Sequence, residues 1–143
     1  MPTDLARAVE LLTSGGFTLA AVRGEEVVTS TERGVKPLLG LLDGGASLAG
    51  YSAADKVVGK AAAFLYVLLK VERLYAGVIS QPALEVLEKH GISVDLGTLV
   101  PAIRNRANTG SCPMETAVTD ADSPEEALGL IRKKLAELNG GAP

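Results

Sequence analysis

The chain has 143 residues, of which 47% are hydrophobic and 3% aromatic, and its formal net charge is -3. This length and composition predict one domain over residues 1–143 with a sizeable apolar core, and they exclude a disordered chain. The mild acidity and the absence of tryptophan argue against a general nucleic-acid binder, which neutralises phosphates and stacks on bases.

The first part of the chain predicts a helix, a β-hairpin and a second helix. Residues 3–12 carry apolar side chains at helical spacing. Apolar residues over 17–28, interrupted by the turn Arg23-Gly24-Glu25, predict the hairpin. A short helix over 34–42 follows, with Pro37 in its first turn, where proline is tolerated.

The second part alternates between strands and helices. In chain order, the apolar patterns predict a strand over 47–54, a buried helix over 56–70, a strand over 71–79, a helix over 82–90, and strands over 92–96 and 100–105. Ser123, Pro124 and Glu126 then form a capping box that opens a final helix. This order predicts an α/β fold with three layers, a mixed β-sheet of about five strands with helices on both faces.

The sequence also predicts a cytoplasmic protein that does not enter membranes. The longest apolar run, residues 61–69, is far shorter than the ~20 residues that cross a bilayer. The N-terminus lacks the basic and apolar regions of a secretory signal, and the single cysteine, Cys112, has no partner for an internal disulfide.

Two common kinds of site are disfavoured. Gly59-Lys60 resembles the end of a phosphate-binding loop, but Ala54 stands where the loop needs glycine and Ala61 where it needs Ser or Thr. A catalytic zinc usually takes three protein ligands, and the chain has one His and one Cys. Its histidine, His90, falls at a predicted helix end, where the helix dipole favours it. We therefore expect no metal and no cofactor.

The first candidate segment is the predicted start of the buried helix, residues 55–60. Asp55 is expected to cap this helix, and Lys56 and Lys60 to share one face of its first turns. Gly59 inside a helix costs about 1 kcal/mol relative to alanine, so the close approach of another backbone or of a ligand is expected there. The segment is either an anion site or a capped helix whose lysines reach solvent.

The second candidate segment contains Arg104, Asn105 and Arg106. In an extended chain the two arginines share one face and Asn105 takes the other. Two neighbouring guanidinium groups suit a phosphate or a carboxylate. The alternative is a solvated, basic strand end.

The third candidate segment begins at Cys112. Pro113 is expected to be the first residue of a helix, which places Cys112 at the N-cap, where the dipole stabilises a thiolate. The alternative is an inert thiol beside an ordinary helix start that Glu115 caps by itself.

Together, segments 54–61, 103–106 and 112–115 resemble a small uncharacterised prokaryotic family, a domain of unknown function with a cytidine-deaminase-like fold. The resemblance covers roughly residues 5–138. In deaminases, a His-Ala-Glu motif opens the helix after a central strand, and Asp55-Lys56 stands at the matching position here. The zinc-binding Pro-Cys-x-x-Cys motif corresponds to the region 112–115.

This resemblance implies the fold without the zinc chemistry. At most one motif cysteine is kept, the first motif has no histidine, and the general-acid glutamate has no clear counterpart. The resemblance further implies that the side chains of the first and third segments converge at one place, namely Asp55, Lys56, Lys60, Cys112 and Glu115.

Three hypotheses for the function follow. In the first, the protein binds a nucleotide or a related small anionic metabolite through Lys56, Lys60, Arg104, Asn105 and Arg106. In the second, it is an enzyme with Cys112 as nucleophile, Lys56 as electrostatic helper, and Glu115 or Asp55 as acid/base. In the third, it is a non-catalytic scaffold that forms a homodimer.

Overall fold

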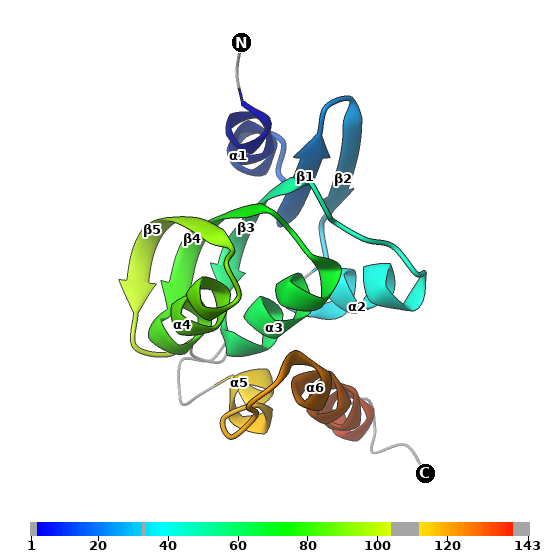
Figure 1. Cartoon of the computed structure of the whole chain (residues 1–143), viewed down its shortest axis with the longest axis vertical. Coiled ribbons are helices and arrows are strands. Elements are labelled where there is room, and N and C mark those ends of the chain that lie inside the picture. Colours follow the sequence, from blue (N-terminus) through cyan, green and yellow to red (C-terminus); the bar gives the residue numbers. More distant parts are fainter. Residues whose placement is uncertain (1–2, 33, 104–111, 139–143) are drawn as a thin grey trace.

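One mixed sheet runs through the computed structural model, which describes residues 3–32, 34–103 and 112–138 (Figure 1). The strand order is β2-β1-β3-β4-β5. The strands are β1 (Leu19–Arg23), β2 (Glu26–Ser30), β3 (Ser52–Val58), β4 (Arg73–Ser80) and β5 (Ser93–Val100). β1 is antiparallel to both of its neighbours, whereas β3, β4 and β5 are parallel. The predicted mixed α/β sheet is therefore confirmed.

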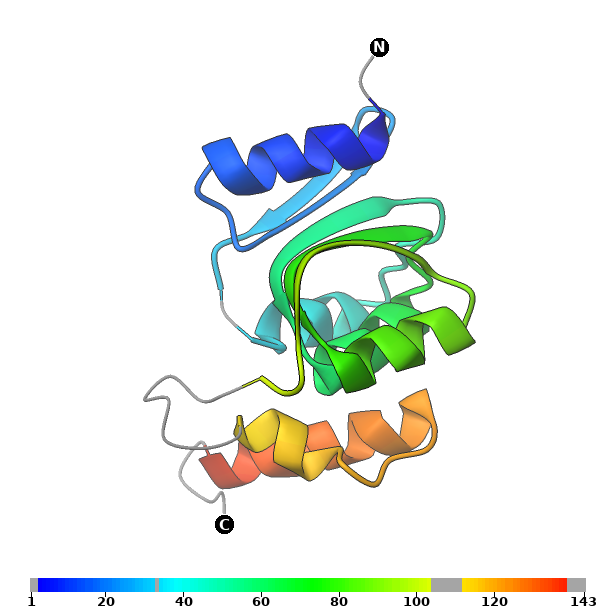
Figure 2. The same ribbon diagram turned by 90° about the vertical axis from the view of Figure 1, so that its left-hand side faces the viewer.

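Helices lie on both faces of this sheet and in one additional layer (Figure 2). Their bounds are α1 (Asp4–Ser14), α2 (Lys36–Asp43), α3 (Lys60–Leu69), α4 (Gln81–Lys89), α5 (Pro113–Ala117) and α6 (Pro124–Leu138). α1 covers one face, and α2, α3 and α4 cover the other. α5 and α6 pack on α3 and on each other rather than on the sheet. The prediction of three layers is therefore wrong, because α5 and α6 form a fourth layer.

α3 lies at the centre of the main core. Its buried residues are Ala61, Ala62, Ala63, Phe64, Leu65, Tyr66 and Leu69. A helix that is apolar nearly all round must be covered on most sides, and α3 contacts β3, α2, α4, α5 and α6. None of the helices in the described ranges is long and apolar enough to span a bilayer.

Two predicted boundaries are wrong around β3 and α3. The strand predicted over 47–54 begins at Ser52 and continues to Val58, so Asp55 and Lys56 lie in a strand. The helix predicted from residue 56 begins at Lys60. Pairing with β1 and β4 on both sides stabilises the extended form of residues that also suit a helix start.

A third boundary error concerns the predicted strand over 100–105. Instead, β5 continues to Val100, and a bend follows at Pro101 and Ala102. Residues 104 and 105 lie outside the described residues.

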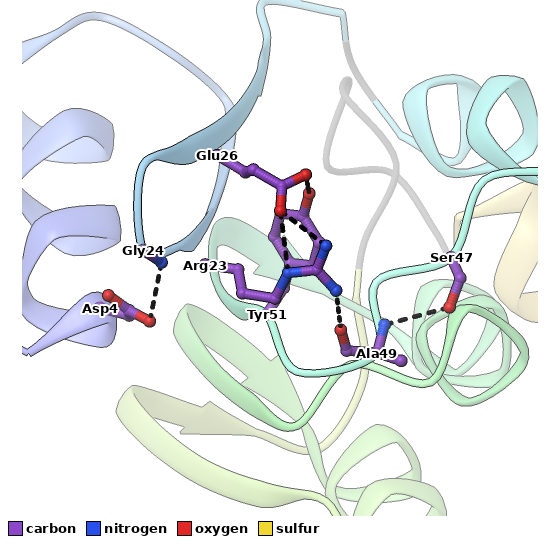
Figure 3. Close-up of polar contacts among 7 residues, drawn as sticks. All are labelled: Asp4, Arg23, Gly24, Glu26, Ser47, Ala49 and Tyr51. Atoms are coloured by element: carbon purple, nitrogen blue, oxygen red, sulfur yellow. Dashed lines mark hydrogen bonds and ion pairs between the residues drawn. The ribbon is translucent and has the colours of Figure 1, made fainter.

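Arg23 ties the hairpin to the segment that precedes β3 (Figure 3). Its guanidinium donates to Glu26 Oε1 at 2.7 Å and to the Ala49 carbonyl at 2.9 Å. It also lies 4.7 Å from the centre of the Tyr51 ring, and the Tyr51 hydroxyl donates to Glu26 Oε2 at 3.2 Å. These contacts hold the predicted hairpin against the segment that precedes β3.

The three parallel strands bend together along one line, and this gives them the arched profile in Figure 2. Near the middle of the three strands, Lys56, Gly77 and Gly97 have no partner in the strand register, although the residues on either side of them do. A Cβ on Gly77 would lie 2.8 Å from the Lys56 carbonyl oxygen, and one on Gly97 would lie 2.6 Å from the Gly77 oxygen. Neither position has room for a side chain while the bend is kept.

Candidate functional site

The N-terminus of α3 is capped by a side chain from α5. The backbone N–H groups of Lys60 and Ala61 donate to the two carboxylate oxygens of Glu115, at 2.6 and 3.0 Å. The N-cap residue of α3 is Gly59, which has no side chain to offer. The first N–H groups of a helix lack intrahelical partners and lie at its positive end, so the Glu115 carboxylate both satisfies and neutralises this end.

Gly59 makes room for that carboxylate. A Cβ at residue 59 would lie against the carboxyl carbon and both oxygens of Glu115. The backbone of Gly59 is extended, with φ -99° and ψ 179°, so the missing side chain matters here rather than an unusual conformation. The sequence predicted Gly59 inside a helix and beside another backbone or a ligand. Gly59 instead precedes α3, and the group beside it is the side chain of Glu115.

The side chain of Lys60 leaves α3 toward the end of α5. Its ammonium donates to the Thr119 carbonyl at 2.9 Å and lies 5.7 Å from the centre of the Phe64 ring. Within the part of the chain that the structure describes, Lys60 forms no ion pair with a carboxylate. Because an ammonium has three donors, donors remain for solvent or for a ligand.

Two shallow depressions adjoin at Lys60 and Pro82. The first has a volume of about 160 Å³ and is also lined by Ala102, Glu115, Thr116 and Thr119. The second, of about 190 Å³, extends along α4 to its end, and its charged or titratable lining residues besides Lys60 are Glu85, Lys89, His90 and Asp122. Ligand pockets commonly measure ~300–1,000 Å³, so each depression would hold only part of a metabolite.

Asp55 has a different role from the predicted one. The Tyr66 hydroxyl donates to Asp55 Oδ2 at 2.6 Å, and the Val57 N–H donates to Oδ1 at 3.3 Å. Burial raises the pKa of Asp55 to about 6, although these hydrogen bonds act in the opposite direction. Burial, and then the charge of Asp55, also raise the pKa of Tyr66. The predicted cap is wrong, since Asp55 joins the bend of β3 to α3.

Lys56 is exposed on β3 and lines neither depression. It cannot share a helix face with Lys60, because only Lys60 belongs to α3, and that prediction is wrong. Of the residues expected to converge, the structure brings Lys60 and Glu115 together at the first depression. It places Asp55 and Lys56 outside both depressions.

Cys112 is the N-cap of α5, and Pro113 is its first residue, as the sequence predicts. The thiol is partly buried against the main core and makes no capping hydrogen bond. The N–H of Cys112 donates to the Ile103 carbonyl at 3.1 Å. The nucleophilic role of Cys112 stays a prediction. Arg104, Asn105 and Arg106 lie outside the described residues.

The chain matches the family model TM1506, a domain of unknown function (DUF1893), over residues 7–135. It belongs to the DUF1893 family. A solved structure of a DUF1893 family protein (TM1506) from Thermotoga maritima is 31% identical to it, with a TM-score of 0.83. That match covers 96% of this chain and 92% of the other. No curated protein matches the chain. The predicted membership of a family of unknown function is confirmed.

Some lining residues of this DUF1893 domain carried no signal in the sequence. Thr116 and Thr119 are ordinary helix and turn residues that reach the depression only because α5 lies beside Lys60. His90 is the C-cap residue of α4, as predicted, with Nδ1 2.9 Å from the Val86 carbonyl oxygen. It also lines the second depression, which the sequence did not indicate.

Proposed function

We propose that the protein binds a small anionic metabolite, a nucleotide or a sugar phosphate among the candidates, with Lys60 as its main contact. The observation that carries this proposal is the ammonium of Lys60, which stands where two depressions adjoin. This ammonium donates a hydrogen bond to the Thr119 carbonyl, and no carboxylate in the described ranges forms an ion pair with it. A positioned cation of this kind attracts phosphates and carboxylates.

The anion is expected at the Lys60 side chain and not at the backbone of α3. Free N–H groups at a helix start are a common anion site. Here the N–H groups of Lys60 and Ala61 already bind Glu115. A second anion beside this carboxylate would meet like-charge repulsion, so the ligand must approach from the side of the ammonium and the threonines.

Binding is expected to depend on the anionic group more than on a base. The chain has five aromatic residues, two Phe and three Tyr, and the structure describes them all. Among these, Phe64 lines a depression, but its side chain is only 2% exposed. Neither depression therefore offers an open aromatic face for stacking a base among its lining residues, and such stacking contributes about 1–3 kcal/mol per base in nucleic-acid-binding proteins.

Arg104, Asn105 and Arg106 are proposed as additional contacts. They follow shortly after Ala102, which lines the first depression. The hydrogen bond between Ile103 and Cys112 closes the chain on either side of the segment that contains them. Two guanidinium groups would offset the acidic side chains around Lys60, namely Glu85, Glu115 and Asp122.

The test is a thermal-shift and calorimetric screen with inorganic phosphate, a pentose phosphate and a nucleoside monophosphate. We expect stabilisation by at least one of them, and loss of most of it in Lys60→Met, which keeps the apolar stem. Lys56→Met is the matched control, because Lys56 is exposed and outside both depressions. The proposal fails if none of the probes binds, or if the two variants respond alike.

We also propose that the fold is cytidine-deaminase-like and has lost its metal site. This is supported by the start of α5, whose Glu115 reaches the start of α3, the helix that follows the central strand β3. Glu115 stands at the position of the second cysteine in the Cys-x-x-Cys pattern of the resemblance. The carboxylate would therefore stand in the place of a zinc ligand, and it binds the amides of Lys60 and Ala61 instead.

The residues present do not fit a catalytic zinc. The chain has one His and one Cys, and no group of three metal-binding side chains occurs among the described residues. We expect no stoichiometric zinc binding when the metal is titrated against the protein. One zinc bound per chain would contradict the proposed loss.

A further inference from the structure

None of the strands that the structure describes pairs with the outer edge of β5. β5 is the last strand of the sheet and bonds to β4 on its inner side only; Figure 1 shows it at the rim, beyond α4. Proteins protect such edges with lysines, prolines or short strands. β5 is eight residues long, and Asp95 is its one charged residue.

Two leucines on this edge strand face the same side of the sheet. Leu96 is 40% exposed and Leu99 is 44% exposed. They pair in register with Ala76 and Ile79 of β4, both of which are buried in the helix-side core. Residues three apart normally face opposite sides of a strand, but the register skips Gly97, and the partners of both leucines lie in the helix-side core, so both leucines face that side.

We propose that two copies of the chain associate through β5. The two strands run antiparallel about a two-fold axis, so that Leu96 of each copy faces Leu99 of the other. A two-fold interface uses the same surface on both sides, and this pairing covers both exposed leucines of each chain. The two sheets then form one continuous sheet.

A second copy fits this edge because the proposed register makes the strand complementary to itself. Leu96 lies opposite Leu99, so the exposed apolar side chains meet each other, and the small Gly97 lies opposite Thr98. The same register places Asp95 opposite Val100, so no two carboxylates face each other.

The proposed interface is separate from the ligand site. Neither Leu96 nor Leu99 lines either depression. Dimerisation and ligand binding can therefore fail independently of each other.

The first test measures the mass in solution by light scattering after gel filtration at micromolar concentration. We expect the wild type to have the mass of two chains, and the double variant Leu96→Lys and Leu99→Lys to have the mass of one, with an unchanged circular dichroism spectrum. Val27→Lys is the matched control, because Val27 is 46% exposed on β2, the other edge strand, and should leave the dimer intact. A monomeric wild type, or a dimeric double variant, would overturn the proposal.

The second test checks the register by disulfide trapping. In a Cys112→Ser background, chains with Leu96→Cys and chains with Leu99→Cys are oxidised separately and as a mixture. Opposed residues bring Cα atoms within the ~7 Å that a disulfide requires, so the mixture should give a covalent dimer and each variant alone should not. Equal cross-linking of one variant with itself would refute the register.

Discussion

The Glu115 carboxylate fills the space that a side chain on Gly59 would occupy, so these two residues fit together only while residue 59 is glycine. This pairing joins the layer of α5 and α6 to the centre of the fold. It also explains why one of the chain's glycines stands directly before the most buried helix.

Gly59→Ala should therefore destabilise the protein. The new methyl group would displace the carboxylate, and a lost helix cap typically costs about 0.5–2 kcal/mol. Urea unfolding measures the change. Gly129→Ala is the control, because Gly129 lies within α6 with no atom near its missing Cβ, and alanine there should stabilise by about 0.5–1 kcal/mol. Equal effects would disprove the close approach.

Substitutions of Glu115 should lower the free energy of unfolding in graded steps. Glu115→Gln keeps one acceptor oxygen but loses the charge and the second acceptor, and Glu115→Ala loses both hydrogen bonds. We expect the free energy of unfolding to decrease from wild type to Gln to Ala, by about 1–3 kcal/mol for the last. Glu10→Gln, on the exposed side of α1, should change little. A neutral Glu115→Ala would show that α3 does not need this cap.

The raised pKa of Asp55 predicts that the stability of the protein depends on pH. Its folded-state pKa of about 6 lies above the ordinary value of 3.8, so the folded chain binds this proton more tightly than the unfolded chain does. The resulting stabilisation is fully present below about pH 4, and it is lost as the pH rises through about 6, by up to about 3 kcal/mol.

Asp55→Asn separates this effect from all other titrations. The amide oxygen can still accept from the Tyr66 hydroxyl, but the side chain no longer ionises. Unfolding free energies at about pH 4 and about pH 7 should differ less for the variant than for the wild type. If both proteins lose the same stability over this range, the buried carboxyl is not the cause.

Cys112 tests the enzymatic alternative. The thiol is partly buried against the main core and makes no capping hydrogen bond, so a reagent reaches it less easily than an exposed thiol. If the chain is a binding protein, it should react with iodoacetamide near neutral pH no faster than a small-molecule thiol does. Much faster alkylation, suppressed by Glu115→Gln, would favour the nucleophile hypothesis instead.

The element order could be predicted from the sequence because local signals agree with tertiary packing over most of the chain. Ser123, for example, caps α6 as the predicted capping box indicates. The error around Asp55 has a physical reason. The segment reads as a helix start, but pairing with β1 and β4 keeps its backbone extended, and both of these strands lie elsewhere in the chain.

The candidate site was less predictable for a similar reason. Lys60 and Glu115 were both expected to contribute, but a pattern cannot show that Glu115 caps a helix 55 residues earlier in the chain. One of the two interpretations of this segment had Glu115 cap its own helix, which is the more common local arrangement. The lining threonines depend on the same long-range contact.

Because α5 and α6 pack mainly on α3 and on each other, we expect this pair of helices to detach as a unit while the strands stay paired. Each detachment would free the amides of Lys60 and Ala61 from the carboxylate. Their hydrogen exchange rates should then match those of α6, although both amides belong to the most buried helix. A ligand that bridges Lys60 and the end of α5 would slow exchange in both places together.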